Sequence, residues 1–313
     1  MTLFEGALLF PGQGSQEKGM GRDLAEFWPE AMDLWKIGEK ISGFPLREIY
    51  WDGEAKDQAK TIYLQPAMTV VNLSLWFYLK SHLKPLSLAG HSLGEYSALV
   101  AAKVIEVQDA LKLVSIRGKL MQEAGTFSPG AMVAVLKMPL SQLENLVSKL
   151  AEKGTILIAN YNTYTQYVVS GEINLIDELV NNLKSYKGVR AIKLPVNGAF
   201  HSPLMREASL ELAKEIEKVH FSSPDFPVYL NSTGEKELNP DRIKTVLKEQ
   251  MISSVFWIQS IENMYKQGIY SYLEIGPKNV LSKMTAQILA DKTDVKVYKC
   301  SNLKESKSFA EVK

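Results

Sequence analysis

The alternation of short apolar runs with longer helical patterns constrains the fold of this 313-residue chain more than any other feature. Apolar runs at 7–10 and 87–89 predict strands, and a helix through Ala102 follows the second run at once. A further amphipathic helix is predicted over 107–124. Strands that alternate with helices indicate a largely parallel sheet covered on both faces.

The middle of the chain has a different order of elements. Strands are predicted at 131–136, 155–159, 166–170 and 189–195, and helices at 141–153 and 173–186. The order β-α-β-β-α-β over about 65 residues is typical of the ferredoxin-like, or split βαβ, pattern. We therefore expect a small domain, 130–195, inserted into a large α/β domain of 1–129 and 196–303, with a flexible tail at 304–313. The alternative is one continuous sheet, but the adjacent second and third strands of the segment favour an insertion.

Composition excludes several classes of protein. Apolar residues make up 46% and charged residues 23%, which is typical of a globular chain. A net charge of +1, from 36 basic and 35 acidic residues, argues against a nucleic-acid or anionic-membrane binder. The one cysteine, Cys300, allows neither an internal disulfide nor a Cys-rich metal site, and it favours a reducing compartment.

Two segments test whether the chain is targeted to a membrane or secreted. Residues 1–10 contain Glu5 and no Lys or Arg, which is not typical of a secretory signal. Residues 61–79 carry no charge and approach the length of a membrane span, but polar residues interrupt them. A buried helix that starts near Pro66 is the preferred interpretation, since proline is tolerated in a first turn.

The most specific local motif is Gly90-His91-Ser92-Leu93-Gly94. A strand ends before it and a helix begins within it, which is the context of a nucleophile elbow. Ser92 would lie at a helix N-terminus, where backbone N–H groups favour negative charge. The structural alternative is a serine N-cap flanked by glycines.

A serine nucleophile needs a base, and the chain offers His82, His91, His201 and His220. The side chain of His91 should point away from that of its neighbour at a sharp turn, and His82 and His220 lie in lysine-flanked segments typical of a surface. His201 lies in a Gly/Pro-bounded loop after the last small-domain strand, where catalytic groups are often found. The sequence favours His201 only modestly over the other three.

Arg117 lies on the apolar stripe of the 107–124 helix, three residues after Val114 and four before Met121. A buried guanidinium is costly unless it meets an anion. It therefore predicts either a structural salt bridge, which is the more common case, or a clamp for a substrate carboxylate. Together with Ser92 it suggests an acyl group that ends in a carboxylate.

The turn Gly12-Gln13-Gly14-Ser15 lacks the full spacing of a nucleotide-binding loop. Backbone N–H groups offered to an oxyanion fit it better.

Five ordered motifs then support a resemblance. They are residues 10–16 (FPGQGSQ), 90–95 (GHSLGE), 117–118 (RG), 198–201 (GAFH) and 274–277 (EIGP). Over essentially 8–289 the chain resembles the malonyl-CoA:acyl-carrier-protein transacylases of bacterial fatty acid synthesis. The resemblance implies an α/β-hydrolase-like large domain with a ferredoxin-like small domain.

The resemblance also implies site roles by position. Ser92 would be the nucleophile and His201 its base, oriented by the backbone carbonyl of Gln250 instead of an acid. Backbone N–H groups of Gln13 and Leu93 would form the oxyanion hole. The remaining implied residues are the carboxylate clamp Arg117 and the acyl-pocket residues Met121, Asn160 and Phe200.

The implied reaction is ping-pong transfer of malonyl from malonyl-CoA, through a malonyl-serine, to the phosphopantetheine thiol of an acyl carrier protein. No metal or organic cofactor is implied, and we expect a cytoplasmic monomer that binds neither nucleic acid nor membrane. Two alternatives stay open: a trans-acting malonyl acyltransferase of a polyketide synthase, and a hydrolase of carrier-bound thioesters. A carrier-docking module without catalysis is a third, which the intact Ser92 and His201 disfavour.

Several positions depart from the family pattern. Tyr164-Thr165 replaces the usual Pro-Gly, Lys103 and Lys278 replace common glycines, and Phe256 replaces an arginine. Phe200 resembles the malonyl-selective pattern of polyketide acyltransferases, which keeps the pathway open. Lys187, Arg190 and Lys193 are candidate contacts for an acidic carrier protein, although an ordinary solvated edge is the simpler interpretation.

Overall fold

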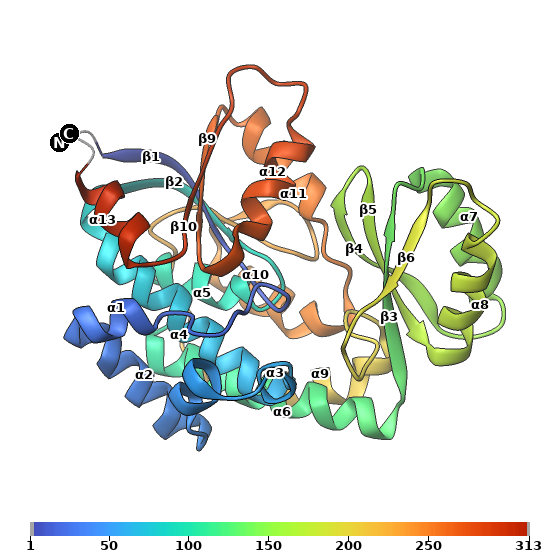
Figure 1. Cartoon of the computed structure of the whole chain (residues 1–313), viewed down its shortest axis with the longest axis horizontal. Helices are drawn as coiled ribbons and strands as arrows, with labels where there is room; N and C mark the ends of the chain where they lie inside the picture. Colours follow the sequence, from blue (N-terminus) through green and yellow to red (C-terminus); the bar gives the residue numbers. More distant parts are fainter. Residues whose placement is uncertain (1–2, 312–313) are drawn as a thin grey trace.

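Two β-sheets organise the chain in a computed structural model that describes residues 3–311 (Figure 1). The larger sheet has the strand order β10-β9-β1-β2-β7-β8. Its strands are β1 (Phe4–Phe10), β2 (Leu83–Gly90), β7 (Val228–Tyr229), β8 (Lys236–Glu237), β9 (Ser271–Ile275) and β10 (Lys296–Cys300). Only β7 and β8 pair antiparallel, so the prediction of a largely parallel sheet is confirmed.

Alternate side chains of β1 enter opposite cores, as strand geometry requires. Leu8 and Phe10 belong to the larger core, and Ala7 and Leu9 to the other. Helices of the larger core are α1 (Arg22–Phe27), α2 (Pro29–Ser42), α4 (Thr61–Leu79), α5 (Gly94–Ala101), α6 (Val107–Phe127), α9 (Arg206–Glu217) and α10 (Pro240–Glu249). The other core contains α11 (Trp257–Lys266) and α12 (Val280–Ile288). Both faces of the sheet are therefore covered, and a short helix, α3 (Ala55–Gln58), precedes α4.

The second sheet stands beside the first, in green and yellow in Figure 1, and all its neighbouring strands are antiparallel. Its strands are β3 (Gly130–Leu136), β4 (Ile156–Thr163), β5 (Gln166–Glu172) and β6 (Arg190–Lys193), in the order β4-β5-β3-β6. Helices α7 (Leu140–Ala151) and α8 (Ile173–Leu183) cover the face that carries Val133 and Val135. Met132 and Ala134, on the other face, line a cavity toward the larger sheet. These elements follow one another as the sequence predicts, while the domain boundaries stay a prediction.

Helix α4 begins a turn earlier than expected. The carbonyl of Lys60 accepts bonds from the N–H groups of Tyr63 and Leu64, so Pro66 lies inside the second turn and not in the first. Proline cannot donate to the carbonyl of Ile62, and the tertiary burial of nearly the whole helix offsets this loss. Among residues 3–311, no helix has the length and apolar content needed to cross a membrane.

The C-terminal segment, expected as a flexible tail from 304 onward, is helical over most of its length. Residues Leu303–Glu311 form α13, whose first N–H donates to Asp23 Oδ2 at 2.8 Å. The ring of Phe309 packs edge-on against Phe4 and Tyr298. An apolar contact on strand β1 therefore anchors a segment whose charged composition suggested solvent exposure, and only 312–313 of the expected tail lie outside the described residues.

Candidate active site

The predicted elbow is present between β2 and α5. Ser92 has a φ of 50°, a left-handed conformation that costs a non-glycine residue about 1–3 kcal/mol. The flanking glycines are required by space: a Cβ at Gly90 would lie 1.9 Å from the carbonyl carbon of Gly94, and a Cβ at Gly94 would lie 1.9 Å from the Phe10 carbonyl oxygen. The turn is therefore closed against strand β1, with the serine at its apex.

Asn231, which sequence reasoning missed, holds this turn from the turn that follows β7. Its side-chain Oδ1 accepts the N–H of Ser92 at 2.6 Å, and its Nδ2 donates to the carbonyl of Gly90 at 2.6 Å. Its own N–H donates to Glu95 Oε2 at 2.7 Å. One amide thus bridges the two sides of the turn and offsets its strain, as a paired strand would.

His201 is the histidine that the fold brings to Ser92. Its Nε2 lies 2.8 Å from Ser92 Oγ, and its Nδ1 lies 3.0 Å from the carbonyl oxygens of both Gln250 and Ser253. Because carbonyls only accept, Nδ1 carries the proton and Nε2 is free to accept one from the serine. Burial, reinforced by the charge of Arg117, lowers the pKa of His201 to about 3, so the ring is neutral at physiological pH.

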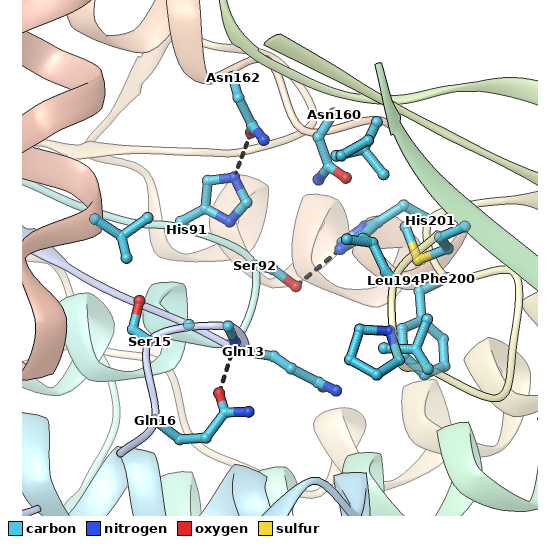
Figure 2. Close-up of a pocket in the computed structure, with 18 of the residues that line it drawn as sticks. Gln13, Ser15, Gln16, His91, Ser92, Asn160, Asn162, Leu194, Phe200 and His201 are labelled. Atoms are coloured by element: carbon cyan, nitrogen blue, oxygen red, sulfur yellow. Dashed lines mark hydrogen bonds between the residues drawn. The ribbon is translucent and has the colours of Figure 1, made fainter. Parts of the chain in front are cut away.

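Among the described residues, the other three histidines make no hydrogen bond to Ser92, although His91 lines the same cavity. His91 Nε2 is 2.8 Å from Asn162 Oδ1, turned away from Ser92 as expected (Figure 2). His82 is partly exposed beside Ser81, and His220 is exposed.

Arg117 is 1% exposed, and its guanidinium meets only neutral acceptors. Nη1 donates to Gln65 Oε1 at 2.9 Å, while Nη2 donates to Ser92 Oγ and to Gln250 Oε1, both at 3.1 Å. No carboxylate of the described residues lies within the 4.0 Å of an ion pair, and Nε has no hydrogen-bond partner there. Burial lowers the pKa of Arg117. The alternative of a structural salt bridge is thus not what the fold provides.

Glu95 is the buried acid behind this group. Burial raises its pKa to about 7, against the lowering effects of Asn231, Gln250 and Arg117. Its Oε1 has no hydrogen-bond partner in the described chain. At neutral pH the Glu95 carboxyl is therefore only partly ionised, and it neutralises only part of the charge of Arg117.

Gln250 reaches the site in a second way that the sequence did not indicate. Besides its carbonyl contact to His201, its side-chain Nε2 donates to the Ser92 carbonyl at 3.0 Å. It therefore contacts the nucleophile, the histidine and the guanidinium of Arg117.

The turn of Gln13 approaches the elbow closely. A Cβ at Gly12 would lie 2.3 Å from the carbonyl oxygen of His91 and 3.4 Å from the nitrogen of Leu93, so only glycine allows the approach. Asn72 on α4 holds the turn by donating to the carbonyl of Pro11 at 3.0 Å. The backbone nitrogens of Gln13 and Leu93 accordingly lie on facing loops, the arrangement an oxyanion hole needs.

A cavity of about 310 Å³ joins these groups. Its lining includes Gln13, Ser92, Arg117, Met121, Asn160, Phe200 and His201 from the predicted set, whereas Leu93 and Gln250 are not among the lining residues. Figure 2 shows Ser92 and His201 facing each other, with Asn160 above them and Gln13 below in this view.

Apart from Phe200, the positions that depart from the family pattern are not among the residues that line this cavity. Lys103 and Lys278 have φ values of 60° and 67°, where glycine would be unstrained. Phe256 stacks on Tyr161 at 5.2 Å, and Tyr164 donates a hydrogen bond to Glu262. These last two contacts join the small sheet to α11 and the segment before it.

Comparison with known proteins finds relatives of this chain over most of its length. A sequence model of the acyl transferase domain matches residues 7–307. The malonyl CoA-acyl carrier protein transacylase of Escherichia coli O157:H7 is 36% identical over 92% of this chain and 94% of that protein. An acyl carrier protein S-malonyltransferase from Vibrio cholerae superposes with a TM-score of 0.89 at 34% identity, covering 96% of this chain and 98% of its own. A malonyl-transacylase solved in complex with a type II polyketide synthase acyl carrier protein has a TM-score of 0.92 at 31% identity, covering 99% and 100%.

Proposed function

Because this chain belongs to the acyl transferase domain family and is an acyltransferase, we propose that it transfers malonyl from malonyl-CoA to the phosphopantetheine thiol of an acyl carrier protein. The observation that carries the choice of acyl group is Arg117, a buried cation without an acidic partner among the described residues, 3.1 Å from Ser92 Oγ. A carboxylate one methylene away from the reacting carbonyl would pair with it, which an acetyl group cannot do.

In the first half-reaction, Ser92 Oγ attacks the thioester carbonyl while its proton passes to His201 Nε2. The resulting oxyanion is stabilised by the N–H groups of Gln13 and Leu93. The C–S bond then breaks, His201 returns the proton to the coenzyme A sulfur, and malonyl-Ser92 remains. Throughout, the carbonyls of Gln250 and Ser253 hold the ring and stabilise the transient imidazolium.

The second half-reaction runs the same steps with the carrier thiol as nucleophile. His201 takes the thiol proton, the thiolate attacks the ester, and Ser92 leaves with the proton that His201 returns. Because nucleophile, base and oxyanion donors are all side chains or backbone groups of this chain, the proposed cycle needs no metal or organic cofactor.

We assign the reaction to fatty acid synthesis, and the relative solved with a type II polyketide synthase acyl carrier protein supports polyketide synthesis as the alternative. A hydrolase of carrier-bound thioesters would use the same serine and histidine with water as acceptor. Arg117 counts against it, because a hydrolase needs no carboxylate clamp.

The finer assignments rest on the same reasoning. The strand order β4-β5-β3-β6 with two helices on one face supports a ferredoxin-like small domain, and the elbow after β2 supports an α/β-hydrolase-like large one. We place the enzyme in the cytoplasm as a monomer. Of the three candidate carrier contacts, Lys193 pairs with Asp177, which leaves Lys187 and Arg190 as the better candidates.

The test is the intact mass of the protein after incubation with malonyl-CoA or acetyl-CoA. A gain of about 86 Da that disappears in Ser92→Ala, and that moves to holo acyl carrier protein on its addition, is expected. Preferential acetylation would refute the carboxylate clamp. Rapid loss of the adduct as free malonate without carrier protein would favour the hydrolase instead.

A further inference from the structure

Gln65, on helix α4, supports the guanidinium of Arg117 from the side opposite the serine. It is fully buried, its Oε1 accepts from Arg117 Nη1 at 2.9 Å, and its Nε2 lies 3.1 Å from Met121 Sδ. It is not among the residues that line the cavity, whereas its two partners Arg117 and Met121 are, so it acts on a substrate only indirectly.

The packing of α4 against α6 makes this contact possible. At Gly118, next to Arg117, an added Cβ would lie 2.9 Å from the Thr61 carbonyl oxygen and 3.4 Å from Gln65 Cβ. Glycine at this position lets the two helices approach until the amide of Gln65 reaches the guanidinium.

The charge of that acceptor matters more than its position. The two side-chain carbonyl oxygens on Arg117, of Gln65 and Gln250, are neutral, and so is the hydroxyl of Ser92. The ring of Tyr96, 5.8 Å below, adds a further uncharged support. These groups orient the guanidinium without cancelling its charge, so the charge stays available to a carboxylate that enters the cavity.

We infer that Gln65 is a specificity-determining positioning residue: its neutral amide orients Arg117 while leaving the guanidinium charge for an acyl group that carries a carboxylate. This inference rests on the proposed malonyl transfer. A glutamate at this position would have the same shape but would form an internal ion pair with Arg117, and the enzyme would lose its means of distinguishing malonyl from acetyl.

The experiment measures the loading rate constants of Ser92 with malonyl-CoA and acetyl-CoA by intact mass, in wild type, Gln65→Glu, Gln65→Met and Gln122→Glu. In Gln65→Glu we expect the malonyl-to-acetyl ratio to fall at least tenfold. Gln65→Met removes the acceptor without adding charge and should lower the ratio less. Gln122→Glu adds the same charge on α6 at a partly exposed position and should keep the wild-type ratio.

Folding is checked by thermal melting and by labelling of Ser92 with a fluorophosphonate, which has no carboxylate. If Gln65→Glu is unstable, the ratio for Gln65→Met decides, because a ratio is independent of the fraction folded. A wild-type ratio in both Gln65 variants overturns the inference. If wild type itself takes no malonyl group, the proposed function fails instead, so the two failures are distinguishable.

Discussion

Replacing Arg117 with alanine is the most direct test of how the cavity selects its acyl group. The substitution removes a buried cation that has no carboxylate partner among the described residues, and with it the donors to Ser92 and Gln250. A malonyl carboxylate that enters the variant would be buried without its partner. An acetyl group has no carboxylate and would lose no specific contact in the variant.

The magnitude follows from that difference. Truncating one partner of a buried, hydrogen-bonded charge pair costs about 2–5 kcal/mol. At about 1.4 kcal/mol for each factor of ten, malonyl loading should fall about 30-fold to several thousand-fold. The charge of Arg117 also lowers the pKa of His201, so its removal makes the base stronger, and acetyl loading should hold or rise.

The assay is quenched-flow intact mass of the acyl-enzyme at matched concentrations of malonyl-CoA and acetyl-CoA. Lys119→Ala is a matched control, since it removes an exposed cation two residues along the same helix. An equal fall for both thioesters would refute the reasoning, because it would mean that Arg117 supports the serine and not the substrate carboxylate.

Two further predictions concern stability. Lys103→Gly should stabilise the fold by about 0.5–1 kcal/mol, because glycine is unstrained at a φ of 60° and the exposed ion pair of Lys103 with Asp225 contributes little. Glu95→Gln should change how stability depends on pH. The pKa of Glu95 is raised to about 7 by burial, so the folded state binds more protons and wild type loses stability as the pH rises from about 4.5 to about 7. The variant keeps an acceptor for the N–H of Asn231, and its stability should not fall over this pH range.

Urea unfolding measures both. For Lys103→Gly the control is Lys112→Gly inside α6, which should destabilise, and a lower midpoint for Lys103→Gly would contradict the strain assignment. For Glu95→Gln the quantity is the difference in unfolding free energy between variant and wild type at pH 5 and pH 8. It should be more favourable to the variant at pH 8, and a difference independent of pH would contradict the raised pKa.

Strong local sequence patterns predicted much of the fold. The alternation of strands and helices over the first 195 residues was enough to predict the largely parallel sheet, because strands buried on both faces form continuous apolar runs and helices show an apolar period of 3.6 residues. The sequence predicts no individual strands or helices after residue 195, where β7 and β8 have two residues each, too few to show a period. The predicted start of α4 was wrong because tertiary packing overrode the proline signal. The charged composition of the C-terminal segment gave no indication that α13 packs against the rest of the chain.

The site shows the same division. Ser92 was evident because an elbow has a local sequence requirement, and Arg117 because a cation on an apolar stripe is anomalous within one helix. Asn231, Gln65 and Ser253 left no such signal, since each is an ordinary polar residue whose partner lies on a distant segment: Asn231, for example, is 139 positions away from Ser92.

By itself, the sequence determined which groups could do chemistry here: a serine at a strained turn, and an arginine whose burial needs an anion. Only the tertiary structure decided which of four histidines meets that serine, and that the hydrogen-bond acceptors of the arginine within the described residues are neutral. The physical reason is that hydrogen-bond partners and desolvation are set by distances in space. A chain order that separates His201 from Ser92 by 109 positions carries no information about those distances until the sheets and helices have packed.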